Sequence, residues 1–523
     1  MFTNATTRLR DALRRPLAAA DTLATRLYGW RGNPLHQTGA LAVLAFLVML
    51  ATGVYLLLFY RVGGAYESVA RLESQVFAGR WIRALHRYAA DLAVAAAALH
   101  ALRMGLQGRS WGPRTLAWLS GLVLLFLLYV CGWTGYVMVW DAQARVLAVE
   151  GARLLDWLPI FSEPIQRTFV GDQPIPSAFF FLNLFAHIAV PVGMALVFWV
   201  HVSRIARPVL LPPRPLALAC VGLLLAAALV RPAPLGPPAD PLSLSGAVSL
   251  DLFYAFWLPA SRLASPREVW LCFFAVSLVL ALAPLWTRPA ASSREAASSV
   301  DPHLCTGCEQ CSLDCPYEAI EMVPRSGGPS THFARVDPSL CVSCGICAGS
   351  CAPMAVGPPR RSGRDQLARV RTFVAERRPG PEQVVLVACE RGAGGLAARD
   401  DVLGSPVLRV HCAGDIHTSV IEWLVRSGVG GVLVASCPPR DCWNREGPKW
   451  LLARVHEGRE AELAERVDRG RVRIVHAGEG ERRAVLRALA DFREAVARRG
   501  GAAAEQEVEL TTECETAPRE ATP

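Results

Sequence analysis

The stretch RALHRYAADLAVAAAALHALR, from Arg83 to Arg103, is the segment from which the architecture of the first half of the chain follows. It is apolar enough to cross a bilayer, yet it holds His86 near its start and His100 near its end. The two histidines are fourteen residues apart, which is about four turns of α-helix and about 21 Å of rise, so both project from one face. Ionisable side chains at membrane depth are costly and usually functional, so both are candidate site residues.

The composition of the 523-residue chain indicates a membrane domain. Hydrophobic residues make up 52% of the chain and the mean hydropathy is +0.29, which exceeds what a soluble protein needs. The net charge is +9, but arginine is nearly the only base, with Lys449 as the one lysine, and the arginines lie beside apolar runs. This placement indicates membrane topology rather than a nucleic-acid surface, so we expect no nucleic-acid partner.

Six apolar runs are long enough, or nearly so, to cross the hydrocarbon core as helices: residues 36–60, 83–106, 114–139, 178–204, 214–230 and 268–287. Arginines gather before the first run and after the second, fourth and sixth runs, whereas the other loops carry mixed charge. By the positive-inside rule both termini are expected in the cytoplasm, after a basic lead-in at 1–35 without a cleavable signal. The sequence therefore predicts a multi-pass protein of the inner (cytoplasmic) membrane of a prokaryote.

The fourth run repeats the histidine spacing. In HIAVPVGMALVFWVH, His187 and His201 are again fourteen residues apart. Two facing helices with this spacing can hold two haems, one near each membrane surface, with one imidazole from each helix on each iron. Because the second and fourth runs have the same direction, we expect His86 to pair with His187 on the outer side. His100 would then pair with His201 on the inner side. The alternative is that each histidine only hydrogen-bonds inside a helix bundle.

Four glycines share the spacing of the histidines. Gly39 and Gly53 in the first run are fourteen residues apart, and so are Gly121 and Gly135 in the third. Missing side chains at these positions would let a porphyrin approach the helix backbone, so we expect all four glycines to contact haem. The match between four histidines and four glycines favours the dihaem interpretation over isolated core histidines.

These residues resemble the cytochrome b family of bc and bf complexes, over residues 30–290. The resemblance rests on LATGVYLLLFYR, WIRALHR, GWTGYVMVWD and the spacing of His187 and Pro191. It implies a dihaem four-helix bundle at 36–210. Two further transmembrane helices, like those of the family's smaller second half, are expected at 211–290.

The same resemblance implies an outer quinol site, whose members here are Tyr136, Trp140 and Asp251. Asp251 stands where the family has the glutamate of Pro-Glu-Trp-Tyr, and the sequence here reads LDLF. An aspartate can accept a quinol proton. The resemblance also implies that Arg83 contacts a haem propionate. Gln37 stands where the bf branch carries a cysteine for an extra haem, so we expect two haems of the b type.

A Cys-rich segment at 301–357 follows a Ser/Ala/Pro-rich linker at 291–300, and it repeats with a period of 36 residues. CTGCEQCSLDCP and CVSCGICAGSCAP each give the spacing C-x2-C-x2-C-x3-C, which arranges thiolates around a cubane cluster. In two-cluster ferredoxin modules the fourth cysteine crosses over to the other cluster. The expected ligand sets are therefore Cys305, Cys308, Cys311 and Cys351 for one [4Fe-4S] cluster, and Cys341, Cys344, Cys347 and Cys315 for the other. Zinc is the alternative, and it fits this spacing poorly.

From Glu382 the sequence pattern changes to that of a small α/β domain, which is expected at 382–498. VVLVAC, VLRVHC, GVLVASC and RVRIVHA have the pattern of strands alternating with helices, which predicts a mostly parallel sheet. Three of these segments end on cysteines, and a fourth cysteine follows in CPPRDC. Since the carboxyl ends of parallel strands converge, we expect these four thiolates to meet: Cys389, Cys412, Cys437 and Cys442. The polar tail at 499–523 is expected to be disordered.

Residues 382–498 resemble the small iron-sulfur subunit that links a methyl-viologen-reducing hydrogenase to heterodisulfide reductase, notably in HCAGD and VGGVLVASCPPRDC. The resemblance implies one [2Fe-2S] cluster on the four C-terminal cysteines. Two alternatives stay open. GAGGLA after a strand matches a dinucleotide fingerprint, with Asp415 as the nearest acidic residue, and Cys437 with Cys442 can hold zinc.

Together these features predict a multidomain fold with an all-α transmembrane bundle of about six helices, a ferredoxin-like two-cluster α+β module and a small α/β domain. They predict a membrane electron-transfer subunit of a quinone-linked oxidoreductase rather than a complete enzyme. Electrons would pass between a membrane quinone or quinol, two b haems, two [4Fe-4S] clusters and one [2Fe-2S] cluster.

The expected partner is a cytoplasmic flavoprotein subunit, either heterodisulfide-reductase-like or NAD(P)H-linked, because the sequence offers no flavin or nicotinamide site beyond the short fingerprint. A separate Rieske or cytochrome c subunit would be required by one alternative, in which the complex bifurcates electrons from quinol. A second alternative is a redox sensor or assembly scaffold that reports the state of the quinone pool. By similarity to cytochrome b relatives we expect a dimer.

Overall fold

The computed structural model describes residues 2–159, 162–169, 175–203, 208–240, 251–288, 295–325, 327 and 330–500. The chain divides into two compact units, Met1–Arg294 and Glu295–Pro523, and each is described by itself. The division lies within the linker predicted at 291–300. Residues 291–294 of that linker and residues 501–523 of the predicted tail are outside the described part.

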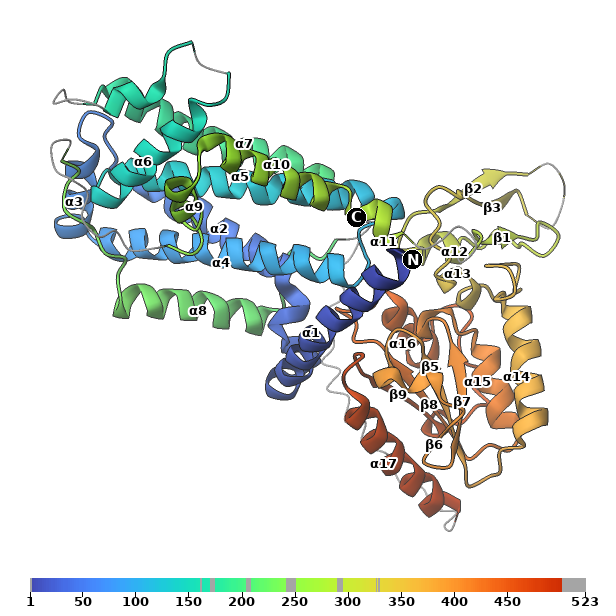
Figure 1. Ribbon diagram of the computed structural model, residues 1–523. Helices are drawn as coiled ribbons and strands as arrows, with labels where there is room; N and C mark the ends of the chain where they lie inside the picture. Colours follow the sequence, from blue (N-terminus) through green and yellow to red (C-terminus); the bar gives the residue numbers. More distant parts are fainter. Residues whose placement is uncertain are drawn as a thin grey trace. The chain divides into compact units, whose positions relative to one another are not determined.

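The first unit is a bundle of apolar helices (Figure 1). Its long helices are α2 (Thr38–Leu57), α4 (Gly79–Leu106), α5 (Thr115–Val139), α7 (Ser177–Ser203) and α10 (Pro266–Ala281). Within the described residues, five helical segments built on these are long and apolar enough to cross a membrane. A sixth apolar helix, α8 (Arg214–Val230), is shorter than those segments. The helical transmembrane architecture predicted from the apolar runs is confirmed.

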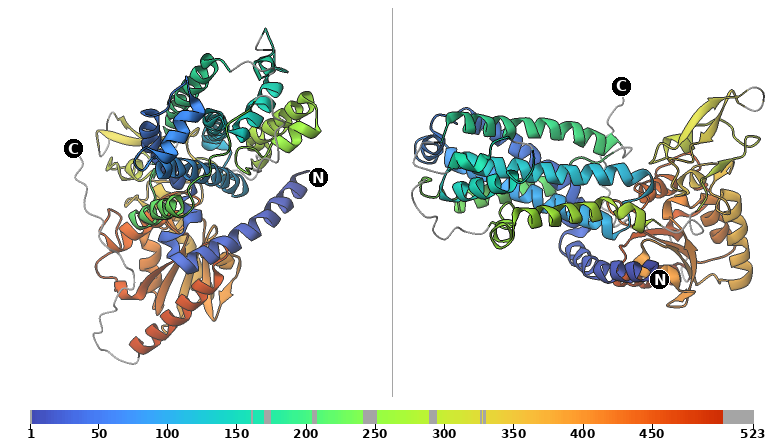
Figure 2. Two further views of the ribbon diagram at one scale, coloured as in Figure 1. Left: turned by 90° about the vertical axis from the view of Figure 1, so that its left-hand side faces the viewer. Right: turned by 45° about the horizontal axis from the view of Figure 1, so that its top comes forward.

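The long helices pack in two pairs, α2 along α4 and α5 along α7, and they run alongside one another in Figure 1 and Figure 2. One core cluster joins all four helices through Ala45, Ala93, Leu128 and Met194. Along the helices, this cluster lies about halfway between the two levels at which the paired histidines stand. Small residues such as Ala45 and Ala93 let helix backbones approach closely, which explains why an alanine-rich run serves as a core helix.

The first unit begins with the helix α1 (Phe2–Gly32), which a non-helical backbone conformation interrupts at Gly29. Its shorter helices are α3 (Ala65–Ser74), α6 (Ala142–Leu155), α9 (Leu258–Leu263) and α11 (Ala283–Thr287). The sequence analysis does not predict α3, α6 or α9, because it searches for continuously apolar runs. These helices bury one face only. In α6, for example, Asp141 caps the first turn by accepting a hydrogen bond from the Ala144 N–H at 2.9 Å, and Leu147 and Ala148 are buried.

The second unit begins with the two-motif cysteine segment. Its strands form two antiparallel pairs, β1 (Ser299–Val300) with β4 (Val356–Gly357) and β2 (Ile320–Pro324) with β3 (His332–Val336). Each cysteine motif contains one short helix, α12 (Gln310–Leu313) or α13 (Ile346–Gly349). The core of this part consists of cysteines together with small apolar side chains. The predicted α+β module is confirmed.

The rest of the second unit is an α/β domain. Four parallel strands form its sheet in the order β7–β5–β8–β9, and the two-residue strand β6 adds to the β7 edge in antiparallel orientation. Their bounds are Val384–Cys389 (β5), Asp401–Val402 (β6), Ser405–Val410 (β7), Gly431–Ser436 (β8) and Val472–His476 (β9). The mostly parallel sheet predicted from the four apolar runs is confirmed, whereas β6 is too short to have left a pattern.

Helices cover both faces of this sheet (Figure 1). One face packs against α14 (Gly363–Arg377), α15 (Thr418–Arg426) and α16 (Gly447–His456). The other face packs against α17 (Arg482–Gly500). Because both faces are covered, β5 and β8 are buried along their whole length, which is why these strands are apolar at every position rather than alternating.

Candidate functional site

The structure brings the four membrane histidines together in two pairs. Helix α4 carries His86 and His100, and α7 carries His187 and His201. The ring centres of His86 and His187 are 6.4 Å apart with their planes tilted by 55°. Metal–imidazole nitrogen bonds are about 2 Å long, so a metal between two such rings holds their centres about 6 Å apart. His100 and His201 are also close enough to interact electrostatically. The spacing of His86 and His187 therefore fits a bis-histidine iron, and His100 and His201 form a second pair on the same two helices.

The Nδ1 atom of each histidine already has a partner on a neighbouring helix. In each case the partner is a hydroxyl group. The distances from hydroxyl oxygen to Nδ1 are 2.9 Å for Thr52 and His86, 3.4 Å for Thr38 and His100, 3.1 Å for Thr134 and His187, and 3.2 Å for Ser120 and His201. His187 Nδ1 also lies 2.9 Å from the Cys131 carbonyl oxygen. Metal-binding histidines usually engage their second nitrogen in this way, which leaves Nε2 available for the metal.

The four glycines lie directly against the histidine rings. A Cβ atom built on Gly39, Gly53, Gly121 or Gly135 would stand 3.1, 3.2, 3.2 or 2.9 Å from the Cε1 atom of the adjacent imidazole. The space that each glycine leaves open is therefore taken by a histidine ring on the neighbouring helix. The expectation that these glycines contact haem stays a prediction, and the structure adds this role in seating the rings.

The sequence analysis missed the hydroxyl groups, although the sequence does contain a signal for them. Each of the four glycines directly follows one of these residues, in the dipeptides Thr38-Gly39, Thr52-Gly53, Ser120-Gly121 and Thr134-Gly135. The hydroxyl residues consequently repeat with the same spacing of fourteen. A search for Ser/Thr-Gly pairs in step with the histidines would have found all four.

Replacing Gly135 with alanine is expected to weaken haem retention at the His187 level. The new Cβ would stand 2.9 Å from His187 Cε1, so the ring has to shift away from its position. Overpacking of this kind costs about 2 kcal/mol. Haem content and the thermal midpoint of haem loss would be measured in the purified protein.

Gly193 supplies the control for this variant. It lies on α7 as well, but a Cβ built on it meets nothing within 4 Å. Gly193→Ala should therefore retain haem like the parent protein. Equal haem loss in both variants would contradict the role assigned to Gly135.

Arg83 has other partners than the predicted haem propionate. Its guanidinium pairs with the Glu73 carboxylate and donates to the Ala233 carbonyl oxygen. The propionate contact remains a prediction, and it would require Arg83 to leave or share these two partners.

Tyr136 and Asp251, two of the predicted quinol-site residues, lie in direct contact. The Tyr136 hydroxyl and the Arg87 guanidinium both donate to the same Asp251 carboxylate oxygen, and Arg87 also pairs with Asp91. The other carboxylate oxygen of Asp251 accepts the backbone N–H groups of Phe253 and Tyr254 at 2.7 and 2.8 Å. Arg87 and Tyr136 directly follow His86 and Gly135 in the chain, so this polar network stands beside the first histidine pair.

The Asp251 carboxyl is ionised in this network. Burial alone would raise its pKa, but hydrogen bonds from Tyr136 and the Tyr254 backbone, together with the charge of Arg87, bring the pKa below its usual range.

Trp140, the third residue predicted for the quinol site, is not part of this polar network. Its ring packs against those of Phe169, Phe179 and Phe180, with ring centres 5.0 to 6.1 Å apart. The structure thus brings together two of the three residues predicted for the quinol site.

The first ferredoxin-type cysteine set surrounds a cavity. Cys305, Cys308 and Cys311 line it together with Cys351 of the second motif, and among the described residues Cys315 is not part of this lining. The Ala355 backbone N–H donates to the Cys351 sulfur at 3.2 Å. Four thiols around one cavity, with backbone N–H groups on the sulfur atoms, fit an iron-sulfur cluster.

The second set groups around Cys344. Burial raises the pKa of the Cys344 thiol well above its usual range, and the nearby thiols of Cys347, Cys315 and Cys341 raise it further. The Ala319 N–H donates to the Cys315 sulfur at 3.4 Å, as Ala355 does to Cys351. Buried thiols in such a group become thiolates when a metal binds, so this set fits a cluster as well.

The four C-terminal cysteines also converge. All four are free and buried, and they lie at or just beyond the carboxyl ends of β5, β7 and β8. The sulfur atoms of Cys389 and Cys437 are 3.8 Å apart, and the Cys442 thiol interacts with those of both Cys412 and Cys437. Gly447 leaves room for them, because a Cβ there would stand 2.8 Å from the Cys412 sulfur. Four buried thiols that converge in this way, without a disulfide, fit a metal centre.

The dinucleotide alternative lacks its structural context. The GAGGLA segment forms a short 3-10 helix, Ala393–Ala398, rather than the start of a long helix. A Cβ on Gly394 would stand 2.4 Å from the Arg482 Cα, so this glycine serves the packing against the chain at the start of α17. Pyrophosphate binding needs a free helix N-terminus after the strand, and this segment does not provide one.

A bundle of membrane-spanning-capable helices with two histidine pairs, followed in the chain by a two-motif ferredoxin module, is typical of membrane-bound electron-transfer proteins. Comparison with known proteins agrees. Family models match for Cytochrome b/b6/petB over residues 32–208, for the 4Fe-4S dicluster domain over 304–355, and for "Methyl-viologen-reducing hydrogenase, delta subunit" over 385–500.

Curated relatives match the helical part. The "Cytochrome b6" of Heliobacterium mobile is 32% identical over 167 residues, which are 31% of this chain and 78% of that protein. The "Menaquinol:cytochrome c reductase cytochrome b subunit" of Geobacillus thermodenitrificans is 27% identical over 186 residues, which are 33% of this chain and 83% of that protein. A solved structure, "Hyperthermophilic respiratory Complex III", aligns at 19% identity and a TM-score of 0.38 over 50% of this chain and 78% of that chain.

The chain belongs to the cytochrome b/b6 family. Its helical domain is followed by a 4Fe-4S dicluster domain and by a domain similar to the hydrogenase delta subunit, so all three predicted resemblances are confirmed. The protein is therefore a membrane electron-transfer protein that uses haem b and [4Fe-4S] clusters.

Proposed function

We propose that this chain is the membrane subunit of a quinol-linked oxidoreductase and carries electrons between a membrane quinol and a soluble partner through two haems and three iron-sulfur centres. The arrangement of the four histidines carries the proposal, because paired imidazoles, each with its Nδ1 already engaged, fit haem iron and little else. The quinol is proposed from the relative in Geobacillus thermodenitrificans, which is named as a subunit of a menaquinol:cytochrome c reductase.

The proposed haem ligands are the predicted pairs, His86 with His187 and His100 with His201. When bound, haems and clusters supply one-electron redox chemistry, and the protein holds them in place and tunes them. The proposed [4Fe-4S] ligand sets are the two crossover sets around the Cys305 cavity and around Cys344. The predicted domain bounds, with the lead-in at 1–35 and both termini in the cytoplasm, are part of the same proposal.

We assign the C-terminal cysteines to a [2Fe-2S] cluster rather than to zinc. Tetrahedral zinc with bonds of about 2.3 Å holds all four sulfur atoms about 3.8 Å from one another. Among the described residues, however, no three of these sulfurs lie within 4.8 Å of one another. The Cys437 sulfur is 3.8 Å from that of Cys389, and Cys442 interacts with Cys412 and Cys437, so the set is extended. An extended set favours two metal ions over one.

Asp251 is the proposed acceptor of a quinol proton. Its carboxyl is ionised and its proton-accepting oxygen faces the Tyr136 hydroxyl and the Arg87 guanidinium. The family's glutamate is replaced by this shorter side chain, and Arg87 holds it in place through an ion pair. A proton could then pass from the quinol to Asp251 while Arg87 remains charged and balances the second carboxylate, Asp91.

The proposed partner is a cytoplasmic flavoprotein subunit, either heterodisulfide-reductase-like or NAD(P)H-linked. The support is the C-terminal similarity to a hydrogenase delta subunit, over residues 385–500. A dimer and a separate Rieske or cytochrome c subunit belong to the same hypothesis. Identification of the subunits that purify with the protein from native membranes would test this part.

Rapid mixing with a reduced quinol analogue tests the proposed function. Reduction of both haems, followed by reduction of the iron-sulfur centres, is expected in the purified complex. Visible absorbance would follow the haems, and freeze-quenched EPR spectra would follow the clusters. Centres that exchange no electrons with quinol or with one another would refute the proposal and favour the redox-sensor hypothesis.

Asp251→Asn should slow quinol-driven haem reduction by about 100-fold, because general-base catalysis is lost when the side chain can no longer accept a proton. Haem content should not change, since Asp251 contacts Arg87, Tyr136 and its own turn rather than a histidine. Glu163→Gln is the control, because Glu163 forms an exposed ion pair with Arg167. An unchanged reduction rate in the Asp251 variant would exclude it as the proton acceptor.

A further inference from the structure

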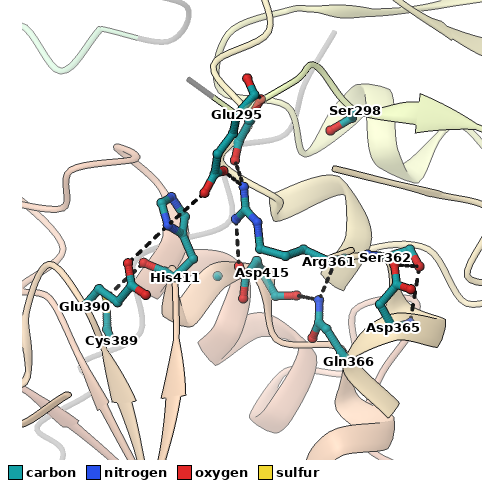
Figure 3. Close-up of polar contacts among 12 residues, drawn as sticks. Glu295, Ser298, Arg361, Ser362, Asp365, Gln366, Cys389, Glu390, His411 and Asp415 are labelled. Atoms are coloured by element: carbon teal, nitrogen blue, oxygen red, sulfur yellow. Dashed lines mark hydrogen bonds and ion pairs between the residues drawn. The ribbon is translucent and has the colours of Figure 1, made fainter. Parts of the chain in front are cut away.

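The two parts of the second unit are joined by buried polar contacts. Arg361 donates to the Ser343 carbonyl oxygen at 2.6 Å, pairs with Glu295, and reaches the Asp415 carboxylate at 3.4 Å (Figure 3). The Gln366 amide donates to the backbone oxygen of Asp415 at 2.8 Å. These contacts hold the turn η6 (Ala413–Asp415) against the second cysteine motif.

This contact makes the second cysteine set and the C-terminal cysteines neighbours. A Cβ built on Gly345, the residue after Cys344, would stand 2.7 Å from the Asp415 Cβ. Asp415 follows Cys412 by three residues. Trp450 of α16 packs with Cys344 and Ile346 in one apolar cluster. The chain segments that carry the two cysteine sets are therefore packed directly against each other at this point.

Arg454 of α16 lies inside this contact and is fully buried, with 0% of its surface exposed. Its guanidinium donates to the Gly414 carbonyl oxygen at 2.6 Å on one side and to the Ser350 hydroxyl at 3.4 Å on the other. Its Nε donates to the Trp450 carbonyl oxygen at 3.0 Å. Gly349 provides the space, because a Cβ there would stand 2.1 Å from an Arg454 nitrogen.

All three hydrogen-bond acceptors of Arg454 are neutral, so its charge has no contact partner. Among the described residues, no carboxylate lies within 4.0 Å of its nitrogens; Asp314 pairs instead with Arg459 at 2.7 Å, and Asp415 pairs with Arg361. The carboxylates that act on Arg454 from a distance, Asp314 and Asp415, are each paired directly with another arginine. A buried cation that shares its anions in this way is still costly. Burial lowers the pKa of Arg454 to about 10, which still leaves it charged at neutral pH.

The thiols supply further negative charge once metal is bound. Cys347 and Cys412, one from each set, are among the electrostatic neighbours of Arg454. An iron-sulfur cluster on thiolates carries a net negative charge, which increases by one when the cluster is reduced. We propose that Arg454 lies between the second [4Fe-4S] cluster and the C-terminal centre, and that its positive charge raises the reduction potential of both.

The proposal rests on the ligand sets given under the proposed function, and it adds a residue that touches neither cluster. A positive charge favours the reduced state of each neighbouring centre, so its removal makes both harder to reduce. The effect on the Cys305 set should be smaller, since Cys347 and Cys412 are among the electrostatic neighbours of Arg454, whereas Cys351 is linked to it through the hydroxyl group of the preceding residue, Ser350.

The test is an EPR-monitored redox titration of the full-length protein with Arg454 replaced by leucine, by glutamine and by lysine. In the two neutral variants the equilibrium constant for reduction of each neighbouring centre is expected to fall at least tenfold. This corresponds to a reduction potential lower by about 59 mV for one electron. Lysine keeps the charge and should restore most of the difference. Iron and sulfide analysis of the parent protein comes first, so that an error in the ligand sets is detected separately.

Arg471 supplies a matched control. It also donates to backbone carbonyl oxygens, those of Gly430 and Val429, but these precede β8 at the end of the sheet opposite to the cysteines. Arg471→Gln should leave all potentials unchanged. Unchanged potentials in the neutral Arg454 variants would overturn the proposal.

Cluster loss in the variants would also decide the matter. If the neutral variants lose iron while Arg454→Lys keeps it, the charge is required for the neighbouring centres, as proposed. If Arg454→Lys loses iron to the same extent as Arg454→Gln, the shape of the arginine rather than its charge is needed, and the proposal fails.

Discussion

A protein with His187 replaced by leucine is expected to lose one of the two proposed haems, and with it about half of the b-type absorbance. The ring of His187 stands 6.4 Å from that of His86, centre to centre, and the described part of the bundle offers no third imidazole at this level. With one axial ligand missing, the iron cannot remain low-spin. Haem per polypeptide, measured after extraction, would quantify the loss.

The pairing itself is tested by combining variants. His86→Leu should lose the same haem as His187→Leu, so the double variant should lose no more than either single variant. His187→Leu combined with His100→Leu should lose both haems. The exposed His303 provides the control and should have no effect on haem. Losses that add up within the pair of His86 and His187 would show that these residues hold different cofactors.

The second large effect is expected for Cys442→Ser, which should remove the C-terminal centre. Cys442 is the thiol that interacts with both Cys412 and Cys437, so its loss divides the set. About two irons and the accompanying sulfide should disappear per polypeptide, while the [4Fe-4S] signals and the haems remain. The variant should also unfold at lower temperature, because buried thiols of this site lie in the core of the α/β domain.

Cys272→Ser is the matched control for this experiment, because Cys272 is exposed on α10 and far from any cysteine set in sequence. Its metal content should equal that of the parent protein. Loss of one zinc ion from Cys442→Ser, without any loss of sulfide, would show that the C-terminal site holds zinc and would refute the [2Fe-2S] assignment.

Much of the architecture could be predicted from the sequence, because the relevant patterns are local. The strands β5 and β8 are continuous apolar runs, and the cysteine motifs have fixed spacings. The pairing of His86 with His187 follows from two helices that carry the same spacing in the same direction. Such features need only the period of a helix or strand, not the details of side-chain packing.

The network of Arg87, Asp91 and Asp251 could not be predicted in this way. Arg87 and Asp251 are separated by 164 residues, and nothing in the sequence shows that one guanidinium serves two carboxylates. The burial of Arg454 could not be predicted from the sequence for the same reason. A single arginine on a short helix is usually solvated, and only the packing of Gly349 and Gly414 around it shows that it is buried.

The Ser/Thr-Gly dipeptides have a consequence for how the protein acquires its cofactors. Each histidine is oriented by the helix with which it packs, α2 for those on α4 and α5 for those on α7. The groups that orient each ring therefore belong to the same helix pair as the ring itself. Under the proposed function, an entering porphyrin would meet imidazoles whose orientation is already set on both sides, rather than having to impose it.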